Sequence, residues 1–183
     1  MTPPATERKK VAIITGASQG IGAGLVEAYR RAGYAVVGTS RSISSSDEPG
    51  FLTVQGDITQ RVVRTMLLQG NGHIVNISSS LVDHANSHAV AALTSLTKGG
   101  LAAVTRSLAI EYASRGIRVN AVSLGVIKTP MYGPESYEAI AALHPIGRAG
   151  EISDVVDGIL YLERAPFVTG ETLHIDGGQA AGH

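Results

Sequence analysis

The sequence predicts one α/β domain built on a doubly wound parallel sheet, over residues 10–183, behind a flexible polar tail at residues 1–9. Two observations lead to this prediction. Short, continuous aliphatic runs alternate along the chain with stretches whose apolar residues recur at helical spacing. Strands that alternate with helices form parallel sheets covered by helices. A glycine-rich turn also follows the first aliphatic run directly, as the first strand-to-helix junction of such a fold requires.

The first half of the chain supplies four expected strands. They are the aliphatic runs at residues 11–14, 35–39, 52–55 and 73–77. The first run is short and continuous, which is typical of a strand buried on both faces. A helix is expected from Gly20, with apolar residues on one face and Gly33 as its C-cap. The serine-rich stretch 40–50 indicates a loop, and residues 60–68 indicate a second helix.

One long helix dominates the second half of the chain. We expect it from residue 89 to residue 115, where leucine and valine recur at helical spacing. Within it, Gly99 and Gly100 each cost about 1 kcal/mol relative to alanine, so we expect close packing against a neighbouring element to compensate. Further strands are expected at 117–122 and 172–175, and shorter helices at 134–143 and 152–163.

Composition argues against several kinds of protein. Hydrophobic residues make up 44% of the 183 positions and charged residues 16%, which favours a packed domain over disorder. A net charge of zero gives no electrostatic reason to expect nucleic acid or an anionic membrane as partner. The chain has no cysteine and no apolar run near the roughly 18 residues of a membrane span. Its six histidines lack metal-ligand spacing. We therefore expect a soluble, cytoplasmic protein without a metal site.

The strongest motif is Thr-Gly-Ala-Ser-Gln-Gly-Ile-Gly at residues 15–22, between the first strand and the first helix. Its glycines let the backbone turn sharply and approach a diphosphate, whose charge meets free amides at the helix N-terminus. An ordinary strand-to-helix turn is the alternative, but the flanking strand and helix are the context that a dinucleotide site requires. The cofactor-binding residues predicted in this loop are Gly16, Ser18, Gln19, Gly20, Ile21 and Gly22.

The pattern Thr-Gly-x-x-x-Gly-x-Gly resembles the cofactor fingerprint of the short-chain dehydrogenase/reductase (SDR) family. Further segments resemble the same family in the same order, and the resemblance runs from residue 11 to residue 178. They are Gly56-Asp57, Ile-Val-Asn-Ile-Ser-Ser at 74–79, Lys98, Arg-Val-Asn-Ala-Val at 118–122, Gly-Val-Ile-Lys-Thr-Pro at 125–130, Thr169-Gly170 and Asp-Gly-Gly at 176–178. The resemblance implies a Rossmann-like sheet, a nicotinamide dinucleotide cofactor, and a small-molecule carbonyl or alcohol substrate. It also implies a homo-oligomer, dimer or tetramer, in which the long helix packs against a partner subunit.

The residues after the second strand bear on which nucleotide binds. Dinucleotide folds read the adenosine ribose there, with a carboxylate for NAD or a basic group for a 2′-phosphate. This chain has Ser40 and Arg41 and no acid, which favours NADP over NAD; a solvated surface arginine is the alternative. The resemblance adds Asp57, with Ile58 beside it, at the adenine, and Thr129 at the nicotinamide amide or the phosphates. Taken alone, Asp57 is equally a helix N-cap and Thr129 a turn residue.

The residues expected at the reacting centre match the family only in part. In the family, a tyrosine with a lysine four residues later exchanges a proton with the substrate oxygen, and an earlier serine binds that oxygen. Ser79 matches the serine, with Ser78 and Ser80 as neighbours that leave the register open by one, and Lys98 matches the lysine. Thr94 stands at the tyrosine position. Because an aliphatic hydroxyl has no accessible pKa near neutrality, the role of proton donor is unfilled.

A larger departure follows residues 57–59. The family continues there through a helix, a strand ending in Asn-Asn-Ala-Gly and a second helix, and this segment is missing, at roughly two helix–strand units. The missing strand would hydrogen-bond to the first strand. One hypothesis is a sheet contracted by loss of this central strand. The 18 residues between Gln55 and Ile74 then form a crossover, and the strand at 73–77 pairs with the first strand. The other is that the sequence omits a segment of a longer chain, in which case the intact mass would exceed 18.9 kDa. In addition, Leu124-Gly125 replaces the family's Pro-Gly, and we expect this to loosen a loop beside the nicotinamide.

Two functions are consistent with these residues. The first is an NADP(H)-dependent oxidoreductase that interconverts a carbonyl and an alcohol. The phosphate loop and Lys98 favour it. The second is a catalytically inactive relative that binds a dinucleotide or a partner subunit, which Thr94 and the missing segment favour.

Overall fold

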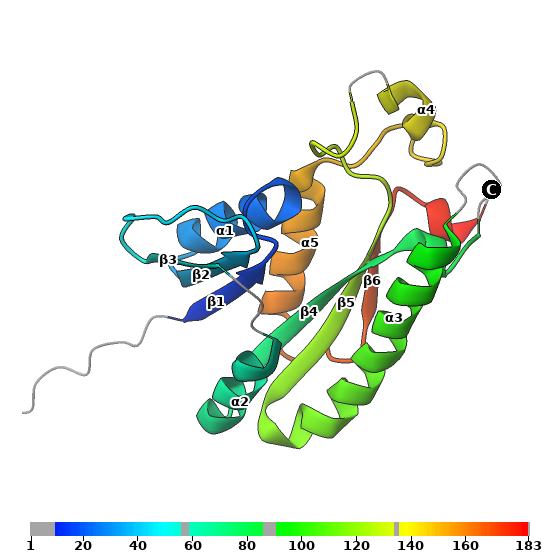
Figure 1. Ribbon diagram of the computed structural model, residues 1–183. Helices are drawn as coiled ribbons and strands as arrows, with labels where there is room; N and C mark the ends of the chain where they lie inside the picture. Colours follow the sequence, from blue (N-terminus) through cyan, green and yellow to red (C-terminus); the bar gives the residue numbers. More distant parts are fainter. Residues whose placement is uncertain (1–9, 56–58, 86–90, 134–135, 183) are drawn as a thin grey trace, which may run out of the picture. The chain divides into compact units, whose positions relative to one another are not determined.

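The computed structural model describes residues 10–55, 59–85, 91–133 and 136–182, with side chains described from Val63 onward in the helix that begins at Thr59. The chain divides into two compact units, residues 1–62 and residues 63–183. The strands are β1 (Val11–Thr15), β2 (Ala35–Ser40), β3 (Phe51–Gln55), β4 (Gly72–Ser79), β5 (Ile117–Leu124) and β6 (Thr172–Ile175). They form two parallel sheets, in the orders β1-β2-β3 and β4-β5-β6 (Figure 1).

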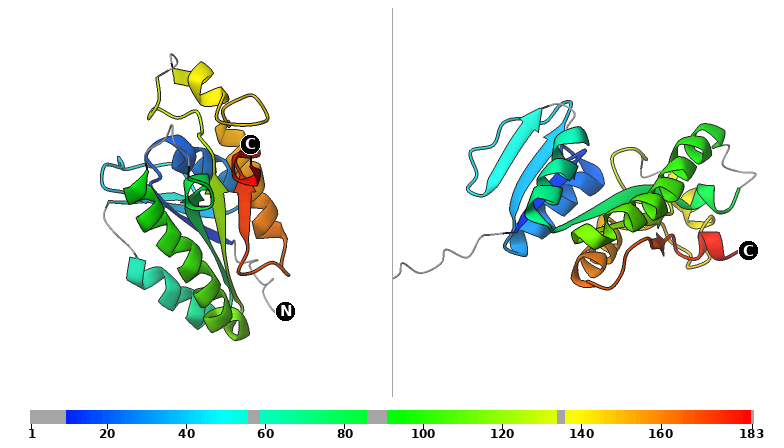
Figure 2. Two further views of the ribbon diagram at one scale, coloured as in Figure 1. Left: turned by 90° about the vertical axis from the view of Figure 1, so that its right-hand side faces the viewer. Right: turned by 90° about the horizontal axis from the view of Figure 1, so that it is seen from below.

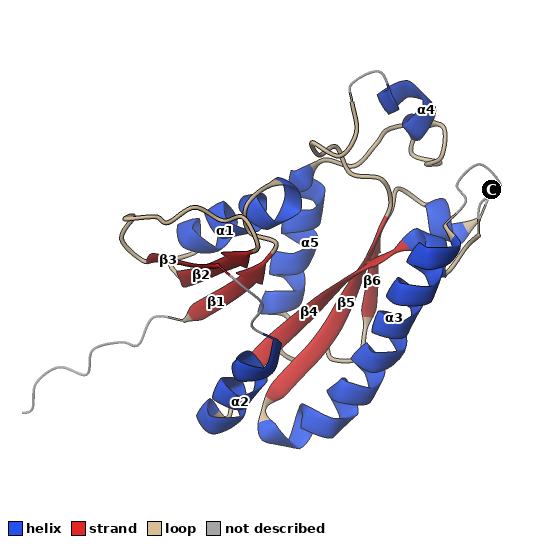
Figure 3. Ribbon diagram, in the orientation of Figure 1, coloured by secondary structure: helices blue, strands red, loops and turns tan. Residues whose placement is uncertain are grey.

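Helices connect most of these strands (Figure 3). They are α1 (Gly20–Arg31), α2 (Thr59–Gln69), α3 (Ala92–Tyr112), α4 (Tyr137–Ala141) and α5 (Ile152–Arg164), with short 3₁₀ turns η1 (Ser80–Val82), η2 (Ala113–Arg115) and η4 (Gln179–Ala181). The predicted α/β class and the order of its elements are confirmed, with element ends shifted by a few residues. No described helix combines the length and the apolar character needed to span a membrane.

In the first unit, α1 covers one face of the sheet. It buries Leu25, Val26 and Tyr29, and the strands bury Ala12, Ile14 and Val36. The alternate side chains of β1 point to the other face, where Val11 is 59% exposed and Ile13 is 36% exposed. The prediction that this strand is buried on both faces is therefore wrong within the described residues, because α1 packs against one face only.

In the second unit, α3 and α5 lie on opposite faces of the sheet (Figure 2). On the α3 face, the Asn76 side-chain amide donates to the Thr105 hydroxyl at 2.9 Å. On the α5 face, an ideal Cβ at Gly158 would lie 2.4 Å from the end of the Ile175 side chain, so a larger residue here would require that side chain to move. Between the helices, every residue of β5 except Arg118 is buried. A central parallel strand covered on both faces has this burial pattern.

The segment Arg118-Val119-Asn120 fixes how α5 ends and β6 begins. The Arg118 guanidinium donates to the carbonyls of Leu162, Glu163, Ala165 and Val168, at 2.8 to 3.2 Å. The Asn120 side chain donates to Val168 at 3.0 Å and accepts from the backbone N–H of Glu171 at 3.0 Å. A cation is favourable at a helix C-terminus, where carbonyls lack partners. The presence of Arg118 and Asn120 in this segment is therefore explained by the hydrogen bonds that they make in the folded protein.

Two expectations about packing are corrected. β4 pairs along eight residues with β5, from Gly72↔Ile117 to Ser79↔Leu124, and β1 pairs with β2. The hypothesis that the strand at 73–77 pairs with the first strand is wrong for the described strands. Among the described strands, β1 pairs only with β2 and β4 pairs only with β5. The close packing expected at Gly99 and Gly100 is also absent among the described residues. A Cβ at Gly99 would lie 3.7 Å from Val82, and one at Gly100 would meet nothing within 4 Å.

Candidate functional site

The glycine-rich loop between β1 and α1 has the backbone that its sequence requires. Gly16 has φ 67° and Gly20 has φ 56°, in the left-handed region that favours glycine. The intervening Ala17 is buried and its N–H donates to the Thr39 carbonyl at 3.1 Å, which ties the loop to β2. Thr15, Gly16, Ser18 and Gln19 are exposed. The loop is thus anchored at its centre and open on both sides.

Gly22 brings the start of α1 against this loop. An ideal Cβ at Gly22 would lie 2.1 Å from the Gly16 carbonyl oxygen and 3.1 Å from the Ala17 Cα, so the helix can begin here only because the residue is glycine. Gln19, the N-cap, makes no side-chain hydrogen bond to the helix. The first amides of an α-helix have no intrahelical partner. The turn thus offers backbone donors and the positive end of the helix dipole to an anion.

The residues after β2 leave the predicted arginine accessible. The Arg41 side chain is exposed, and its carbonyl accepts from the Gln55 side chain at 2.7 Å. The Ser40 hydroxyl accepts from the backbone N–H of Ser42 at 3.2 Å, closing a turn. Both residues belong to the first unit, with the phosphate loop. Asp57 and Ile58 lie outside the described residues.

The three consecutive serines at the end of β4 make different contacts. The Ser78 hydroxyl donates to the Lys98 carbonyl at 3.4 Å. Ser80 is 1% exposed, and its hydroxyl lies 3.2 Å from the Leu124 carbonyl and 2.8 Å from the Gln179 amide oxygen. The Ser79 hydroxyl only accepts, from the backbone N–H of Leu81 at 3.4 Å. Among the described residues, Ser79 is therefore the one of the three whose hydroxyl proton has no acceptor.

Lys98 lies beside the same strand end. Its ammonium group donates to the Ile77 carbonyl at 2.8 Å, two residues before Ser79. Thr94 lies one turn earlier on α3, as a spacing of four residues on a helix requires, and it is half-buried. The structure thus brings Ser79 and Lys98 to one end of β4 with Thr94 on the adjoining helix turn. It places no phenol at position 94.

The loop after β5 is firmly held. Gly125 donates to the Ile175 carbonyl at 3.2 Å, and Lys128 donates to the Gly150 carbonyl at 2.8 Å. The backbone N–H of Val126 donates to the His144 ring at 3.0 Å. Leu124 itself is buried. The expectation that Leu124-Gly125 loosens this loop is therefore wrong, because hydrogen bonds supply the restraint that proline would give. Beyond it, the half-buried Thr129 accepts from the backbone N–H of Met131 at 3.4 Å in a turn.

Helix α5 is capped at its start by a charged pair. The Asp154 carboxylate accepts from both Arg148 nitrogens, at 2.7 and 3.1 Å, and from the backbone N–H of Glu151 at 2.8 Å. The hydrogen bonds from Arg148, and next the one from Glu151, hold the pKa of Asp154 below its ordinary value of 3.8. A carboxylate in the first turn also interacts favourably with the helix dipole. Asp154 is therefore ionised and fixes the start of α5.

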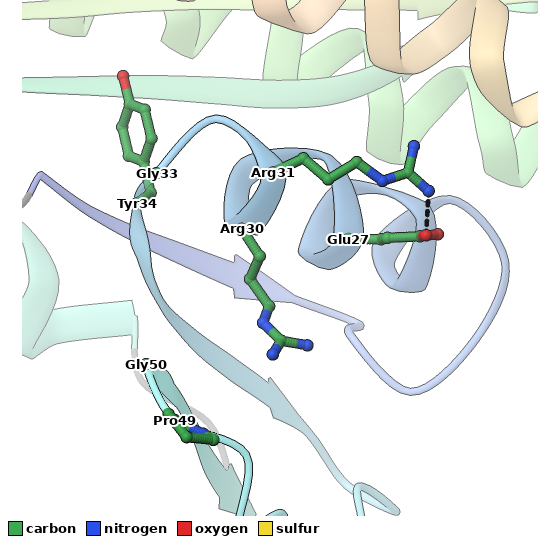
Figure 4. Close-up of a pocket in the computed structure, with 7 residues that line it drawn as sticks. All are labelled: Glu27, Arg30, Arg31, Gly33, Tyr34, Pro49 and Gly50. Atoms are coloured by element: carbon green, nitrogen blue, oxygen red, sulfur yellow. Dashed lines mark hydrogen bonds and ion pairs between the residues drawn. The ribbon is translucent and has the colours of Figure 1, made fainter.

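A cavity of about 390 Å³ in the first unit is lined by Glu27, Arg30, Arg31, Gly33, Tyr34, Pro49 and Gly50 (Figure 4). It lies where α1 ends and β2 and β3 begin. Both of its arginines are paired, Arg31 with Glu27 and Arg30 with Glu48. Ligands of open α/β sheets bind at the carboxyl ends of strands, whereas this cavity is at the amino ends. It is not the dinucleotide site.

Sequence reasoning missed the role of His144, since it considered the histidines only as possible metal ligands. The side chain is 3% exposed and contacts helix α4 at Ile140 and the loop after β5 at Val126. No sequence signal marks it, because its partners are backbone atoms. In the part of the chain that the structure describes, no group of three or more histidine, aspartate or glutamate residues is arranged to hold a metal ion.

The fold and the phosphate loop define a class, the Rossmann-like α/β proteins. A family model described as enoyl-(acyl carrier protein) reductase matches residues 52–180, which is more than half of the chain. The chain belongs to the short-chain dehydrogenase/reductase family, a family of oxidoreductases. The resemblance inferred from the sequence is confirmed.

Similar proteins agree with this assignment. Carbonyl reductase family member 4 of Danio rerio is 45% identical over 116 residues, which cover 63% of this chain and 48% of the relative. Glucose 1-dehydrogenase of Gluconobacter oxydans is 33% identical over 165 residues, 80% of this chain and 59% of the relative. The solved structure "ElxO with NADP Bound" has a TM-score of 0.84 at 25% identity and covers 96% of this chain and 100% of that one. The chain spans about half the length of the curated relatives it matches.

Proposed function

We propose that this chain binds a nicotinamide dinucleotide and is an NADP(H)-dependent oxidoreductase that interconverts a carbonyl and an alcohol on a small molecule. The observation that carries the proposal is the approach of Gly22 to the Gly16 carbonyl, which leaves no room for a Cβ and sets a helix N-terminus against the loop. Left-handed φ at Gly16 and Gly20 and an uncapped first helical turn fit a diphosphate. In this proposal residues 10–183 act as one dinucleotide-binding domain.

Arg41 supports NADP over NAD. Its guanidinium is exposed directly after β2, where a 2′-phosphate is read in dinucleotide folds. A guanidinium matches the geometry of phosphate oxygens and donates two parallel hydrogen bonds to them. Asp57, Ile58 and Thr129 complete the proposed cofactor contacts by resemblance.

The residues on and beside the end of β4 differ in what they contribute to the proposed reaction. When bound, the nicotinamide supplies or accepts the hydride. Ser79, whose hydroxyl proton has no acceptor among the described residues, donates to the substrate oxygen and orients it. Lys98 holds the ribose hydroxyls and places a positive charge beside this strand end. Thr94 cannot release a proton near neutral pH, because it is an aliphatic alcohol. The proton must then come from water, which predicts a slow reaction.

A second candidate function follows from the same residue. Thr94 favours a catalytically inactive relative that binds the dinucleotide or a partner subunit. The outer face of α3 supports assembly into a homo-oligomer, because Leu93 and Leu96 are 74% and 75% exposed there. Gly100 lies on the same helix with open space around it, which would let a partner helix approach closely.

Oxidation of NADPH across a panel of ketones and aldehydes distinguishes the two candidates. The parent chain and the Thr94→Tyr variant are assayed together, since this substitution would restore a phenol one helical turn from Lys98. Turnover by the parent chain would exclude the inactive candidate. Binding of NADPH without turnover in the parent chain, and turnover in the variant, would support a dinucleotide-binding relative that has lost its proton donor. Absence of nucleotide binding would exclude the oxidoreductase proposal.

A further inference from the structure

His144 is a buried polar side chain. It follows α4 and is 3% exposed, and Leu124, Ile127 and Ile140, on the segments that it joins, are buried as well. A buried polar group costs free energy unless its donors and acceptors are satisfied. Both ring nitrogens of His144 are satisfied, and each by a different segment of the chain.

These partners fix the protonation of the ring. Nδ1 lies 2.9 Å from the Ile140 carbonyl, which can only accept, so Nδ1 carries a proton. Nε2 lies 3.0 Å from the backbone nitrogen of Val126, which can only donate, so Nε2 is an acceptor and carries none. The imidazole is therefore neutral and in one tautomer. It joins the end of α4 to the loop that follows β5.

The backbone passes close to His144 on two sides. An ideal Cβ at Gly125 would lie 2.6 Å from His144 Nε2 and 3.0 Å from the Asp176 Cα, so the loop passes between the imidazole and the turn after β6. From the other side, an ideal Cβ at Gly177 would lie 3.2 Å from the His144 Cβ. The backbone N–H of Gly125 donates to Ile175 at 3.2 Å. The loop is thus clamped between β6 and His144.

We propose that His144 is a positioning residue for the nicotinamide end of the cofactor, an inference that rests on the proposed function. The neutral imidazole holds the backbone of Gly125 and Val126. At this place in the family, the proline ring of Pro-Gly restrains the backbone instead. In this chain Leu124 leaves the loop without that restraint, and a hydrogen bond from another segment replaces it. The clamp also links the end of α4 to the loop beside the nicotinamide.

Two substitutions separate the two hydrogen bonds of the ring. His144→Gln places an amide oxygen near Nε2 and keeps the acceptor for Val126. His144→Asn keeps a donor for Ile140 and removes that acceptor. Glu138→Gln, at an exposed residue of α4, is the matched control. Should His144→Asn fail to fold, Gly125→Ala is the alternative, because its Cβ would lie 2.6 Å from His144 Nε2 and push the ring away from Val126 without replacing the histidine.

The first readout is hydrogen exchange at the Val126 amide, which needs no cofactor. We expect exchange to rise by about tenfold or more in His144→Asn, and to stay near the wild-type rate in His144→Gln and Glu138→Gln. Wild-type protection of Val126 in His144→Asn would overturn the clamp. This result is independent of whether the protein binds any nucleotide.

The second readout compares NADPH with ADP-ribose 2′-phosphate, which carries the same diphosphate and no nicotinamide. We expect His144→Asn to raise the Kd of NADPH by roughly tenfold and leave the Kd of ADP-ribose 2′-phosphate unchanged, with rescue in His144→Gln. Equal changes for both ligands, or no change for either, would overturn the positioning role. Absence of NADPH binding by the wild-type protein would instead count against the proposed function.

Discussion

Gly22 allows the phosphate loop to be tested with a single methyl group. An ideal Cβ at this residue would lie 2.1 Å from the Gly16 oxygen, whereas real Cβ contacts essentially never fall under 3.0 Å. In Gly22→Ala the start of α1 must therefore move away from Gly16 by about 0.9 Å, the difference between these two distances. Both groups in this contact belong to the backbone, so rotation of a side chain cannot relieve it.

The displacement has two measurable consequences. Overpacking of a tight contact costs about 1–3 kcal/mol of stability, which lowers the midpoint of unfolding in urea. The same movement withdraws the first amides of α1 from a bound diphosphate. Loss of one hydrogen bond to a charged group costs about 1.5–3 kcal/mol, which corresponds to roughly ten- to hundredfold in Kd. We therefore expect the Kd of NADPH, measured by calorimetry, to rise at least about tenfold in Gly22→Ala.

Gly99→Ala is the matched control. Its Cβ would make an ordinary contact with Val82 at 3.7 Å, and alanine is the better helix former by about 1 kcal/mol. We expect this variant to bind NADPH like the wild-type protein and to be equally stable or slightly more stable. The reasoning about the loop would be refuted if Gly22→Ala bound NADPH as tightly as Gly99→Ala.

Three further predictions concern the cofactor, stability and assembly. Arg41→Gln should raise the Kd of NADPH roughly tenfold or more and leave the Kd of NADH unchanged. Equal losses of affinity for the two nucleotides would mean that Arg41 is a solvated surface residue and does not bind the 2′-phosphate. Asp154→Ala should lower stability by about 1 kcal/mol at neutral pH through loss of the helix cap. Because the pKa of Asp154 is lowered, this contribution to stability is present above pH 3.8 and is lost as the pH falls below that value. The urea midpoints of variant and wild-type protein should therefore converge in acid, and midpoints that stay apart would contradict the prediction. Leu96→Glu should shift sedimentation toward the monomer, and an unchanged sedimentation coefficient would exclude this face of α3 as the interface.

Local features of the site were predictable from the sequence because local geometry determines them. The glycines at 16 and 20 mark a turn that needs positive φ, and the structure gives both that conformation. The alternation of aliphatic runs and helical stretches likewise predicted the element order. Each of these inferences needs only the residues of the strand, turn or helix that it concerns.

Features that depend on distant contacts were not predictable. The three serines at 78–80 look alike in sequence, and only contacts to Gln179 and Lys98, far along the chain, distinguish Ser79. The firmness of the loop at Leu124-Gly125 depends on His144, about twenty residues away, and on β6. The strand that pairs with β4 depends on which other strands the chain forms. In each case the deciding energy comes from a tertiary hydrogen bond or ladder that leaves no pattern in the sequence.

The central claim is that the amides around Gly16, Gly20 and Gly22 hold the diphosphate of a nicotinamide dinucleotide. Calorimetric titration of the folded protein with NADPH and with NADH tests it most directly. We predict saturable binding of one dinucleotide per chain, tighter for NADPH. Protein with a cooperative unfolding transition that bound neither nucleotide would contradict the claim.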